Sequence, residues 1–243
     1  MTFNTDLLGA FREYFEIIPA DTPTLLKESF RLRYQVYCEE CRFPGFDAAN
    51  YADELESDGY DERSVHSLLR HYGTGVWAGT VRLILAHPSD PEAPFPIEVS
   101  TWKQFGGHPW EVRWAERRAL AEVSRLILSQ RFRACRGERQ WPDGVSRASR
   151  RVRPHAAILG LIKACVLMSW ERQTRYCYCA MEPRLAERLK RFGLTFQPIS
   201  PVLNHHGLVR AYLGHLPELM EGVYERFPEV WALLTDNGRT WPR

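Results

Sequence analysis

Two charged residues interrupt an otherwise apolar stretch near the middle of this 243-residue chain. The stretch Leu120–Leu128 is rich in apolar and β-branched residues, as a buried strand is, but it contains Glu122 and Arg125. Burying an ion costs several kcal/mol unless a partner compensates it. We therefore predict that both charges serve catalysis, with the carboxylate of Glu122 as a candidate general base.

Four charged residues earlier in the chain are candidate partners for these two. Arg33 shares a predicted helical stripe with Tyr37, so it either points inward or snorkels at the helix edge. Arg82 lies among the apolar residues of a predicted strand, where it needs a carboxylate. Asp58 and Asp61 belong to an acidic segment between the two arginines. The six charges make three arginines and three carboxylates, which either shape a pocket or only tie the acidic segment to a sheet.

The elements that position these charges follow from apolar spacing and from local start and stop signals. Thr22-Pro23 is typical of a helix start and Gly193 of a helix end, and the whole pattern predicts one α/β domain. The expected helices cover residues 1–20, 23–41, 155–172, 183–192, 217–227 and 228–234. The expected strands cover residues 64–71, 76–85, 120–128, 175–181, 194–199 and 208–213, and residues 87–110 are expected to wrap the surface.

Three segments together resemble the autoinducer (acyl-homoserine-lactone) synthases. The segment Phe30-Arg-Leu-Arg33-x-x-x-Tyr37 resembles their first-helix motif, and Glu56-Ser-Asp58-Gly-Tyr-Asp61 resembles their E-S-D-x-[FY]-D segment. Arg82 and Glu122-x-Ser124-Arg125 match the remaining charged positions. Phe43 falls where those enzymes often carry tryptophan, a departure that would alter the shape of the acceptor site.

That family has the fold of the GNAT acetyltransferases. The long-chain N-acyl amino acid synthases and the acyltransferases associated with PEP-CTERM/exosortase systems share it, and residues 31–40 and 56–66 resemble the last group most closely. The resemblance implies a single-domain, GNAT-like acyl-CoA N-acyltransferase fold, an α/β fold in which helices flank a central twisted mixed sheet in three α-β-α layers. We expect one domain over residues 1–243, with an N-terminal helix at 1–20, a basic insertion at 131–153 and a C-terminal helical extension at 216–243.

The resemblance and the chemistry of amide formation together assign roles to these residues. Glu122, Ser124 and Arg125 are expected to be catalytic, with Glu122 as the base for an acceptor amine. Residues expected to bind substrate are Arg33, Tyr37, Phe43, Asp58, Asp61 and Arg82. Glu122 and Arg125 point to opposite faces of a regular strand, so we predict a β-bulge between them. Backbone N–H groups freed where this strand parts from its neighbour would bind the oxyanion.

The acyl donor is expected to be an acyl carrier protein that presents acyl-phosphopantetheine. The segment Arg70-His-Tyr-Gly73-Thr-Gly75 fits the R-x-x-G-x-G pattern with which GNAT enzymes hold the pyrophosphate of coenzyme A. Such a loop must open a helix so that its amides point at phosphate, whereas this one joins two predicted strands. A coenzyme A thioester is therefore the alternative donor, and no permanently bound cofactor is expected.

Basic residues gather between Arg131 and Arg153 and again near Arg184. One interpretation is a docking surface for an acidic carrier protein, formed by Arg131, Arg133, Arg150, Arg151, Arg184 and Arg188. The other is a solvated basic loop. Few aromatic residues are interspersed among these charges, so nucleic acid is not an expected partner.

The remaining motifs favour ordinary interpretations. The pairs Cys38/Cys41 and Cys177/Cys179 are expected to be reduced thiols and not zinc ligands, so no metal is predicted. His205-His206 is expected to be a solvated pair in a turn. No secretory signal and no apolar run of about 20 residues is found, which predicts a cytoplasmic protein; a peripheral contact with a membrane stays open.

Taken together, the residues predict an enzyme. The expected activity is an N-acyltransferase that moves a fatty acyl group from an acyl carrier protein thioester to the amine of a small, amino-acid-like acceptor. One alternative is an acyl-homoserine-lactone synthase that uses S-adenosylmethionine. A protein that kept the fold as a ligand-binding or regulatory module is the alternative of another class.

Overall fold

The computed structural model describes residues 6–105, 114–133 and 147–242. Its sheet has seven strands, namely β1 (Phe15–Pro19), β2 (Ser64–His71), β3 (Trp77–Leu85), β4 (Leu120–Leu128), β5 (Tyr176–Met181), β6 (Gln197–Asn204) and β7 (Leu208–His215). The α-helices are α1 (Leu7–Tyr14), α2 (Pro23–Tyr34), α3 (Pro96–Phe105), α4 (Arg147–Glu171), α5 (Pro183–Lys190), α6 (Leu216–Arg226) and α7 (Pro228–Thr235). A π-helical turn, η1 (Gln35–Glu40), continues α2, and short 3₁₀ turns are η2 (Ala48–Asn50), η3 (Asp61–Arg63), η4 (Trp114–Ala119) and η5 (Gln130–Phe132).

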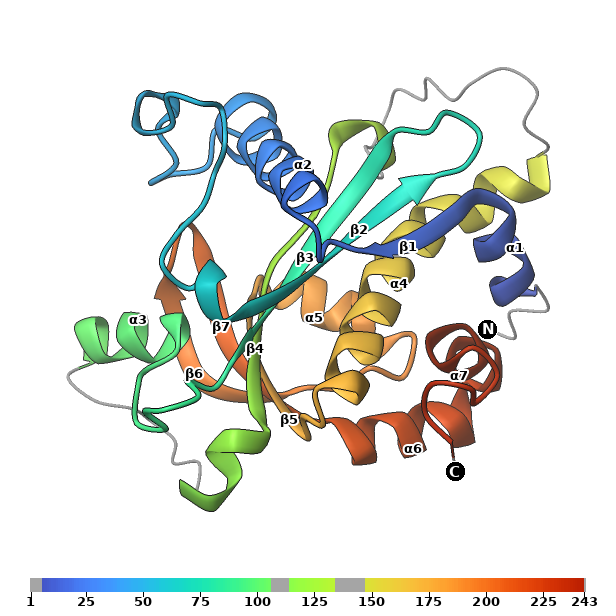
Figure 1. Cartoon of the computed structure of the whole chain (residues 1–243). Helices are drawn as coiled ribbons and strands as arrows, with labels where there is room; N and C mark the ends of the chain where they lie inside the picture. The colour runs from blue at the N-terminus through green and yellow to red at the C-terminus, as the bar shows by residue number, and fades with distance from the viewer. Residues whose placement is uncertain (1–5, 106–113, 134–146, 243) are drawn as a thin grey trace.

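The strands form one mixed sheet in the order β1-β2-β3-β4-β5-β7-β6. Neighbouring strands are antiparallel except for β4 and β5, which run parallel in the centre. Figure 1 shows β4 and β5 side by side at their starts. The predicted single α/β domain with a central mixed sheet is therefore confirmed.

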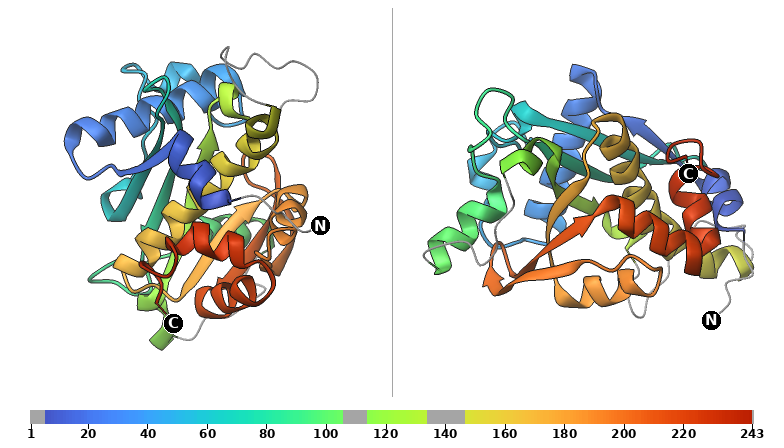
Figure 2. Two further views of the ribbon diagram at one scale, coloured as in Figure 1. Left: turned by 90° about the vertical axis from the view of Figure 1, so that its right-hand side faces the viewer. Right: turned by 90° about the horizontal axis from the view of Figure 1, so that it is seen from below.

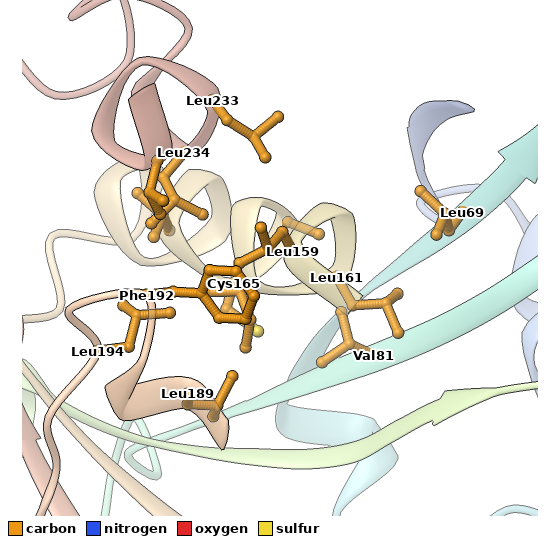
Figure 3. Close-up of a cluster of buried hydrophobic side chains, with 14 of the residues drawn as sticks. Leu69, Val81, Leu159, Leu161, Cys165, Leu189, Phe192, Leu194, Leu233 and Leu234 are labelled. Carbon is orange, nitrogen blue, oxygen red and sulfur yellow. The ribbon is translucent and has the colours of Figure 1, made fainter. Parts of the chain in front are cut away.

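The larger hydrophobic core lies between the sheet and a layer built around α4. Leu159, Leu161 and Cys165 of α4 belong to one cluster with Leu69 and Val81 of the sheet, and Leu161 points toward Val81 (Figure 3). Side chains from α5 and α7 complete the same cluster, and α1 packs beside α7 in both views of Figure 2. A layer of α1, α4, α5, α6 and α7 thus covers this face of the sheet.

On the opposite face, α2 and α3 cover the sheet at different places. Leu32 and Val36 pack with Leu68 and Ile127, while Phe95 and residues of α3 form a separate cluster over β5 and β7. A buried hydrogen bond of 2.8 Å between the hydroxyls of Ser29 and Thr80 ties α2 to β3. The molecule consequently has the expected three α-β-α layers.

The central strand β4 has two irregularities, which together form the site. Its pairing with β5 ends at Val123, opposite Cys179, although β4 continues to Leu128. On its other edge the register with β3 shifts by one residue beyond Ser124, so that two residues of β4 oppose Val81. Arg125 adopts a left-handed backbone conformation with φ of 52° at this point. A β-bulge is thus present in β4, but it lies at Arg125 and the residue that follows it, and not between Glu122 and Arg125 as predicted.

Four expected elements differ in the structure, and one of them is the strand expected over 194–199, which is β6 at Gln197–Asn204. The N-terminal helix expected over 1–20 ends at Tyr14, because Phe15–Pro19 pairs with β2 as an edge strand. Helix α4 begins at Arg147 and not at residue 155, so the end of the basic stretch is helical. The interpretation of the whole of 131–153 as a solvated loop is therefore wrong. Residues 96–105, which lie in the segment expected to wrap the surface and for which no helix was predicted, form α3. The apolar residues of α3 have only a weak helical periodicity, so the sequence did not predict the helix. Packing over the sheet stabilises it instead.

Candidate active site

Glu122 lies on β4 just before the strand parts from β5. Its side chain is 2% exposed, and its Oε2 accepts a hydrogen bond of 3.1 Å from the backbone N–H of Ile97, in the first turn of α3. The unpaired N–H groups of a helix N-terminus favour a carboxylate. Helix α3, which the sequence did not reveal, therefore holds the proposed base in place.

Burial is the main cause of the shifted pKa of Glu122. It raises the pKa of Glu122 to about 8, and the hydrogen bond from Ile97 and the charge of Arg82 only partly oppose it. A base with this pKa is well matched to an amine of similar basicity, although roughly a tenth of it is ionised at pH 7. Glu122 is thus the group in the described chain whose protonation is best suited to amine chemistry.

The three predicted arginines meet three carboxylates beside Glu122, but Glu122 is not one of them. The third carboxylate is Glu56, which is 1% exposed and pairs with both Arg33 and Arg125. Arg125 donates to it at 2.8 Å and at 3.1 Å. The predicted set of six is therefore corrected at one position. Glu56 could have been found from the E-S-D motif, in which it stands two residues before Asp58.

The two aspartates complete the network. Arg33 holds Asp61 with two donors, at 2.7 Å and 3.2 Å. Arg82 donates to both aspartates at 2.6 Å, and through its other terminal nitrogen to Asp58 at 3.1 Å and to the Ser124 hydroxyl at 3.2 Å. We call the six residues Arg33, Glu56, Asp58, Asp61, Arg82 and Arg125 the ion network.

Charge balance keeps the ion network ionised. Burial alone would raise the pKa of Asp61, but the guanidinium groups of Arg33 and Arg82 hold that pKa well below its ordinary value. Glu56 and Asp58 are lowered in the same way, with burial opposing their arginine partners. Each carboxylate is thus engaged by arginine. The arginines of the network are therefore paired with carboxylates of the same network.

Aromatic rings surround the guanidinium of Arg125. It lies 5.1 Å from the ring centroid of Phe46 and 5.6 Å from that of Tyr37. Tyr37 and Phe46 stack at 4.4 Å, and Phe43 contacts Tyr37 edge-on at 5.6 Å. The predicted residues Tyr37 and Phe43 are therefore brought to the site. Phe46, which lies between them and the turn at His206, had no sequence signal beyond its aromatic character.

A single cavity of about 500 Å³ connects these groups to the hydrophobic core. Glu122, Ser124 and Arg125 line it on β4, together with the aromatic rings just described. The rest of its wall is mainly apolar and comes from α4, α5 and α6, with Ile162, Val166, Leu185, Leu189, Leu219 and Met220. The cavity can therefore hold a polar reacting group beside Glu122 and an extended apolar chain beyond it.

The histidine pair of the β6–β7 turn contributes to the same cavity. His205 is half-buried, its Nδ1 lies 2.7 Å from the Ser100 hydroxyl, and both histidines line the cavity. The expectation of a solvated pair is therefore wrong for His205, because α3 packs against the turn. The turn itself was predicted correctly.

The six arginines expected to dock a carrier protein divide into three groups. Arg131, Arg184 and Arg188 are exposed, and Arg188 lies at the wall of the cavity. Arg133 also lines the cavity, but its guanidinium contacts Glu40 and Cys41. Arg150 and Arg151 lie in the first turns of α4, and their side chains are outside the described residues.

The cysteines behave as small apolar residues. Cys165, Cys177 and Cys179 are buried free thiols along the cavity, and burial raises the pKa of Cys177 to about 12. In the described ranges, no group of three or more His, Cys, Asp and Glu side chains is arranged to hold a metal ion. None of the described helices is long and apolar enough to cross a membrane.

Comparison with known proteins agrees with this geometry. A family model described as the acetyltransferase (GNAT) domain matches residues 32–141, a range that contains the whole ion network and Glu122. No curated protein sequence matches the chain.

Several solved structures share the fold at low sequence identity. TofI, in a ternary complex with an inhibitor and MTA, is 17% identical, with a TM-score of 0.55 over 84% of this chain and 95% of TofI. The AHL synthase LasI is 19% identical, with a TM-score of 0.54 over 83% of this chain and 88% of LasI. BjaI, a CoA-dependent acyl-homoserine lactone synthase with bound SAM and isopentyl-CoA, is 19% identical, with a TM-score of 0.54 over 88% of both chains.

Residues 32–141 of the chain thus match the acetyltransferase (GNAT) domain. The fold of the chain, a mixed sheet flanked by helices, is similar to that of the acyl-homoserine-lactone synthase structures.

Proposed function

We propose that the protein is an N-acyltransferase that moves a fatty acyl group from an acyl carrier protein thioester to the amine of a small, amino-acid-like acceptor. The observation that carries this proposal is the placement of Glu122. A buried carboxylate with a raised pKa lies where β4 and β5 part, at the polar part of a cavity whose remaining wall is mainly apolar. One cavity can thus contain both the group that transfers a proton and a bound apolar acyl chain.

The reaction follows from these groups. Ionised Glu122, directly or through a water, takes a proton from the acceptor ammonium group, and the free amine attacks the thioester carbon. Backbone N–H groups of β4 beyond Val123, where pairing with β5 ends, are proposed to bind the oxyanion. The tetrahedral intermediate then collapses, the C–S bond breaks and the amide forms. The thiolate takes the remaining amine proton and leaves as a thiol, which its pKa of about 8.5 favours.

In this proposal Arg125 and Ser124 act by shaping the site. Arg125 at the bulge and Ser124 under Arg82 connect β4 to the ion network, which keeps the acceptor end of the cavity rigid. Tyr37 and Phe43 would contact the acceptor, while Arg33, Arg82, Asp58 and Asp61 support the wall behind them. This scheme keeps all the predicted substrate residues but gives the charged ones an indirect role.

Two acyl donors fit the proposal, a carrier protein thioester and a coenzyme A thioester. Exposed arginines at the cavity wall, such as Arg188, and nearby Arg184 on α5 suit the acidic surface of a carrier protein. The loop Arg70–Gly75, which fits the coenzyme A pattern, joins β2 to β3 and opens no helix. BjaI is described as CoA-dependent, so a coenzyme A thioester is the donor to test against the carrier protein.

The nearest rival is an acyl-homoserine-lactone synthase that uses S-adenosylmethionine, favoured by the fold shared with LasI and BjaI. A ligand-binding protein without turnover is the rival of another class, favoured by the saturation of the ion network. The association with PEP-CTERM/exosortase systems and the cytoplasmic location stay predictions from the sequence.

The test is product analysis by mass spectrometry. Purified protein is incubated with an acyl carrier protein thioester and a mixture of amino acids, with S-adenosylmethionine in a parallel reaction. A linear N-acyl product supports the proposal, a lactone supports the synthase, and bound but unreacted thioester supports the binding protein. The matched variant is Glu122→Gln, which can keep the hydrogen bond from Ile97 through its amide oxygen. It should lower kcat by at least about 100-fold.

A further inference from the structure

The β6–β7 turn brings a second titratable side chain into the cavity that contains Glu122. His205 and Glu122 both line this cavity, and His205 lies close enough to Arg125 for the charge of that guanidinium to act on it. The mechanism proposed above does not use His205. Its half-buried imidazole is therefore a group whose role remains to be assigned.

The hydrogen bonds around Ser100 define which nitrogen of His205 carries the proton. The Ser100 hydroxyl lies 2.7 Å from Nδ1 of His205 and 3.0 Å from the backbone carbonyl oxygen of Pro96. A hydroxyl has one proton, and a carbonyl oxygen can only accept. Both contacts are satisfied when Ser100 donates to Pro96 and His205 donates from Nδ1 to Ser100. The reverse arrangement would place two oxygen atoms at 3.0 Å without a proton between them.

In this tautomer Nε2 of His205 carries a lone pair and can only accept a hydrogen bond. Among the described residues, no hydrogen bond to Nε2 is found. Burial, together with the charges of His206 and Arg125, lowers the pKa of His205 to about 4, so the ring stays neutral at neutral pH. The turn thus brings a hydrogen-bond acceptor to the cavity.

Helix α3 holds both titratable groups. Glu122 is bound to the N–H of Ile97, and His205 to the hydroxyl of Ser100, three residues further along the same helix. Both side chains also line the same cavity, so a small molecule bound there can contact Glu122 with one polar group and His205 with another.

We propose that His205 is a specificity-determining residue that accepts a hydrogen bond from the acceptor. The acceptor would then be an amine that also carries a hydroxyl group as a second hydrogen-bond donor. This inference rests on the proposed function. Ser100 acts as a positioning residue, because it holds the imidazole in the tautomer that accepts.

The experiment compares acceptors that differ by one hydroxyl group, namely serine with alanine and tyrosine with phenylalanine. Wild-type enzyme should prefer the hydroxyl-bearing member of at least one pair by about tenfold or more in kcat/KM. His205→Phe should abolish that preference without changing the KM of the acyl donor, and His205→Gln should restore part of it. No preference in either pair for wild type, or a preference that survives in His205→Phe, would overturn the proposal.

Gln104→Ala is the matched control for docking of the turn. Gln104 joins α3 to the turn through two hydrogen bonds with the backbone of Asn204, at 2.8 Å and 2.9 Å, and does not line the cavity. The control should keep the acceptor preference. If it loses the preference as His205→Phe does, the role of His205 is only to hold the turn.

Nitrogen-15 NMR of the histidine rings tests the proposal apart from catalysis. Wild-type protein should show His205 neutral and protonated on Nδ1, Ser100→Ala should give a mixture of tautomers, and the preferred acceptor should shift the Nε2 signal. A ring protonated on Nε2 would overturn the inference even if acylation occurs. An Nε2 shift without any amide product would instead overturn the proposed function and leave His205 as a binding residue.

Discussion

At the scale of single residues, burial of the Glu122 carboxylate costs free energy, and the same burial gives it the raised pKa that suits a base for an amine. A raised pKa marks a carboxylate whose environment disfavours its charge, and such groups cluster at functional sites. Glu56 is equally buried but has a lowered pKa, because two arginines compensate it. Two glutamates of one chain thus differ in role because one has cationic partners and the other has a backbone N–H.

The raised pKa of Glu122 predicts how stability depends on pH. Between its ordinary pKa of 4.5 and about 8, the folded state keeps the proton that the unfolded state has lost. The free energy of unfolding therefore falls as pH rises through this range and levels off above it. Glu122→Gln removes this effect. The variant should match wild type near pH 4.5 and exceed it by a few kcal/mol at pH 8.5 in urea unfolding. A constant difference at both pH values would contradict the raised pKa.

The same pKa predicts the pH dependence of the rate. The kcat of the wild-type enzyme should rise with pH to a plateau, with a midpoint near 8, since only ionised Glu122 can take a proton. Titration of the acceptor amine could produce a similar curve. Measurements with two acceptors whose amine pKa values differ by about one unit separate the two, because a midpoint set by Glu122 stays in place. A midpoint that follows the acceptor would assign the titration to the amine.

At the scale of elements, the ion network joins the loop before η3 to α2, β3 and β4. Arg33 comes from α2, Arg82 from β3 and Arg125 from the bulge of β4. Their partners stand within six residues of one another, from Glu56 to Asp61. An otherwise irregular segment is thereby held against the sheet beside the cavity.

Removal of one carboxylate from this network should be strongly destabilising. Glu56→Gln leaves Arg33 without one partner and Arg125 with Asp58 alone, and an uncompensated buried charge costs about 3–5 kcal/mol. The prediction is a loss of this size in the free energy of unfolding, measured by urea denaturation at pH 7. The control is Asp53→Asn, an exposed change in the same segment that should alter stability by less than about 0.5 kcal/mol. Equal effects of the two changes would show that the network contributes no specific stability.

At the scale of the whole molecule, three surfaces converge on one cavity. The ion network and the aromatic rings bound its polar end, α3 and the β6–β7 turn hold Glu122 and His205, and α4, α5 and α6 line its apolar part. Because these parts come from the full length of the described chain, the site forms only when the two halves of the sheet join at β4 and β5.

The apolar part of the cavity predicts acyl-length selectivity. Leu219 of α6 lines it and packs near Gly214 and Cys177. Leu219→Ala enlarges the cavity, so the preferred acyl chain should lengthen by about two carbons, measured by competition between carrier-protein thioesters of different length. Leu233→Ala removes an equal volume from the core at α7, outside the cavity wall. It should destabilise the protein by about 2–5 kcal/mol without altering the length preference. A change in the preferred acyl length in both variants would indicate that any loss of core packing, and not the cavity wall in particular, alters this preference.

The exposed arginines of α5 give a prediction about the donor. Reversing both charges with Arg184→Glu and Arg188→Glu should raise the KM for an acyl carrier protein thioester by tenfold or more, and the effect should shrink at high salt. The KM for an acyl-pantetheine that lacks the protein should change much less. If both donors are affected alike, the arginines act on the cavity and not on a docked protein.

Local signals in the sequence sufficed for most elements but not for all. Strands β2, β3 and β4 and helix α5 follow from alternation, apolar stripes and Gly193. Strand β1 was mistaken for helix because its residues continue an apolar run, and only pairing with β2 decides its form. Helix α3 has a weak local pattern, and its place over the sheet stabilises it.

The sequence alone determined that Glu122, Arg125, Arg33 and Arg82 had to be functional or paired, because charges among apolar residues cannot be buried without compensation. It also predicted a bulge between Glu122 and Arg125, since these residues cannot share a face of a regular strand, and the structure has the bulge at Arg125 and Leu126. Only the tertiary structure decided which carboxylate meets which arginine, because ion pairs depend on distances that no sequence spacing specifies. In the structure Glu56 pairs with two arginines, whereas Glu122 accepts a hydrogen bond from the N-terminus of α3. His205, which the sequence placed in a turn, is part of the cavity wall.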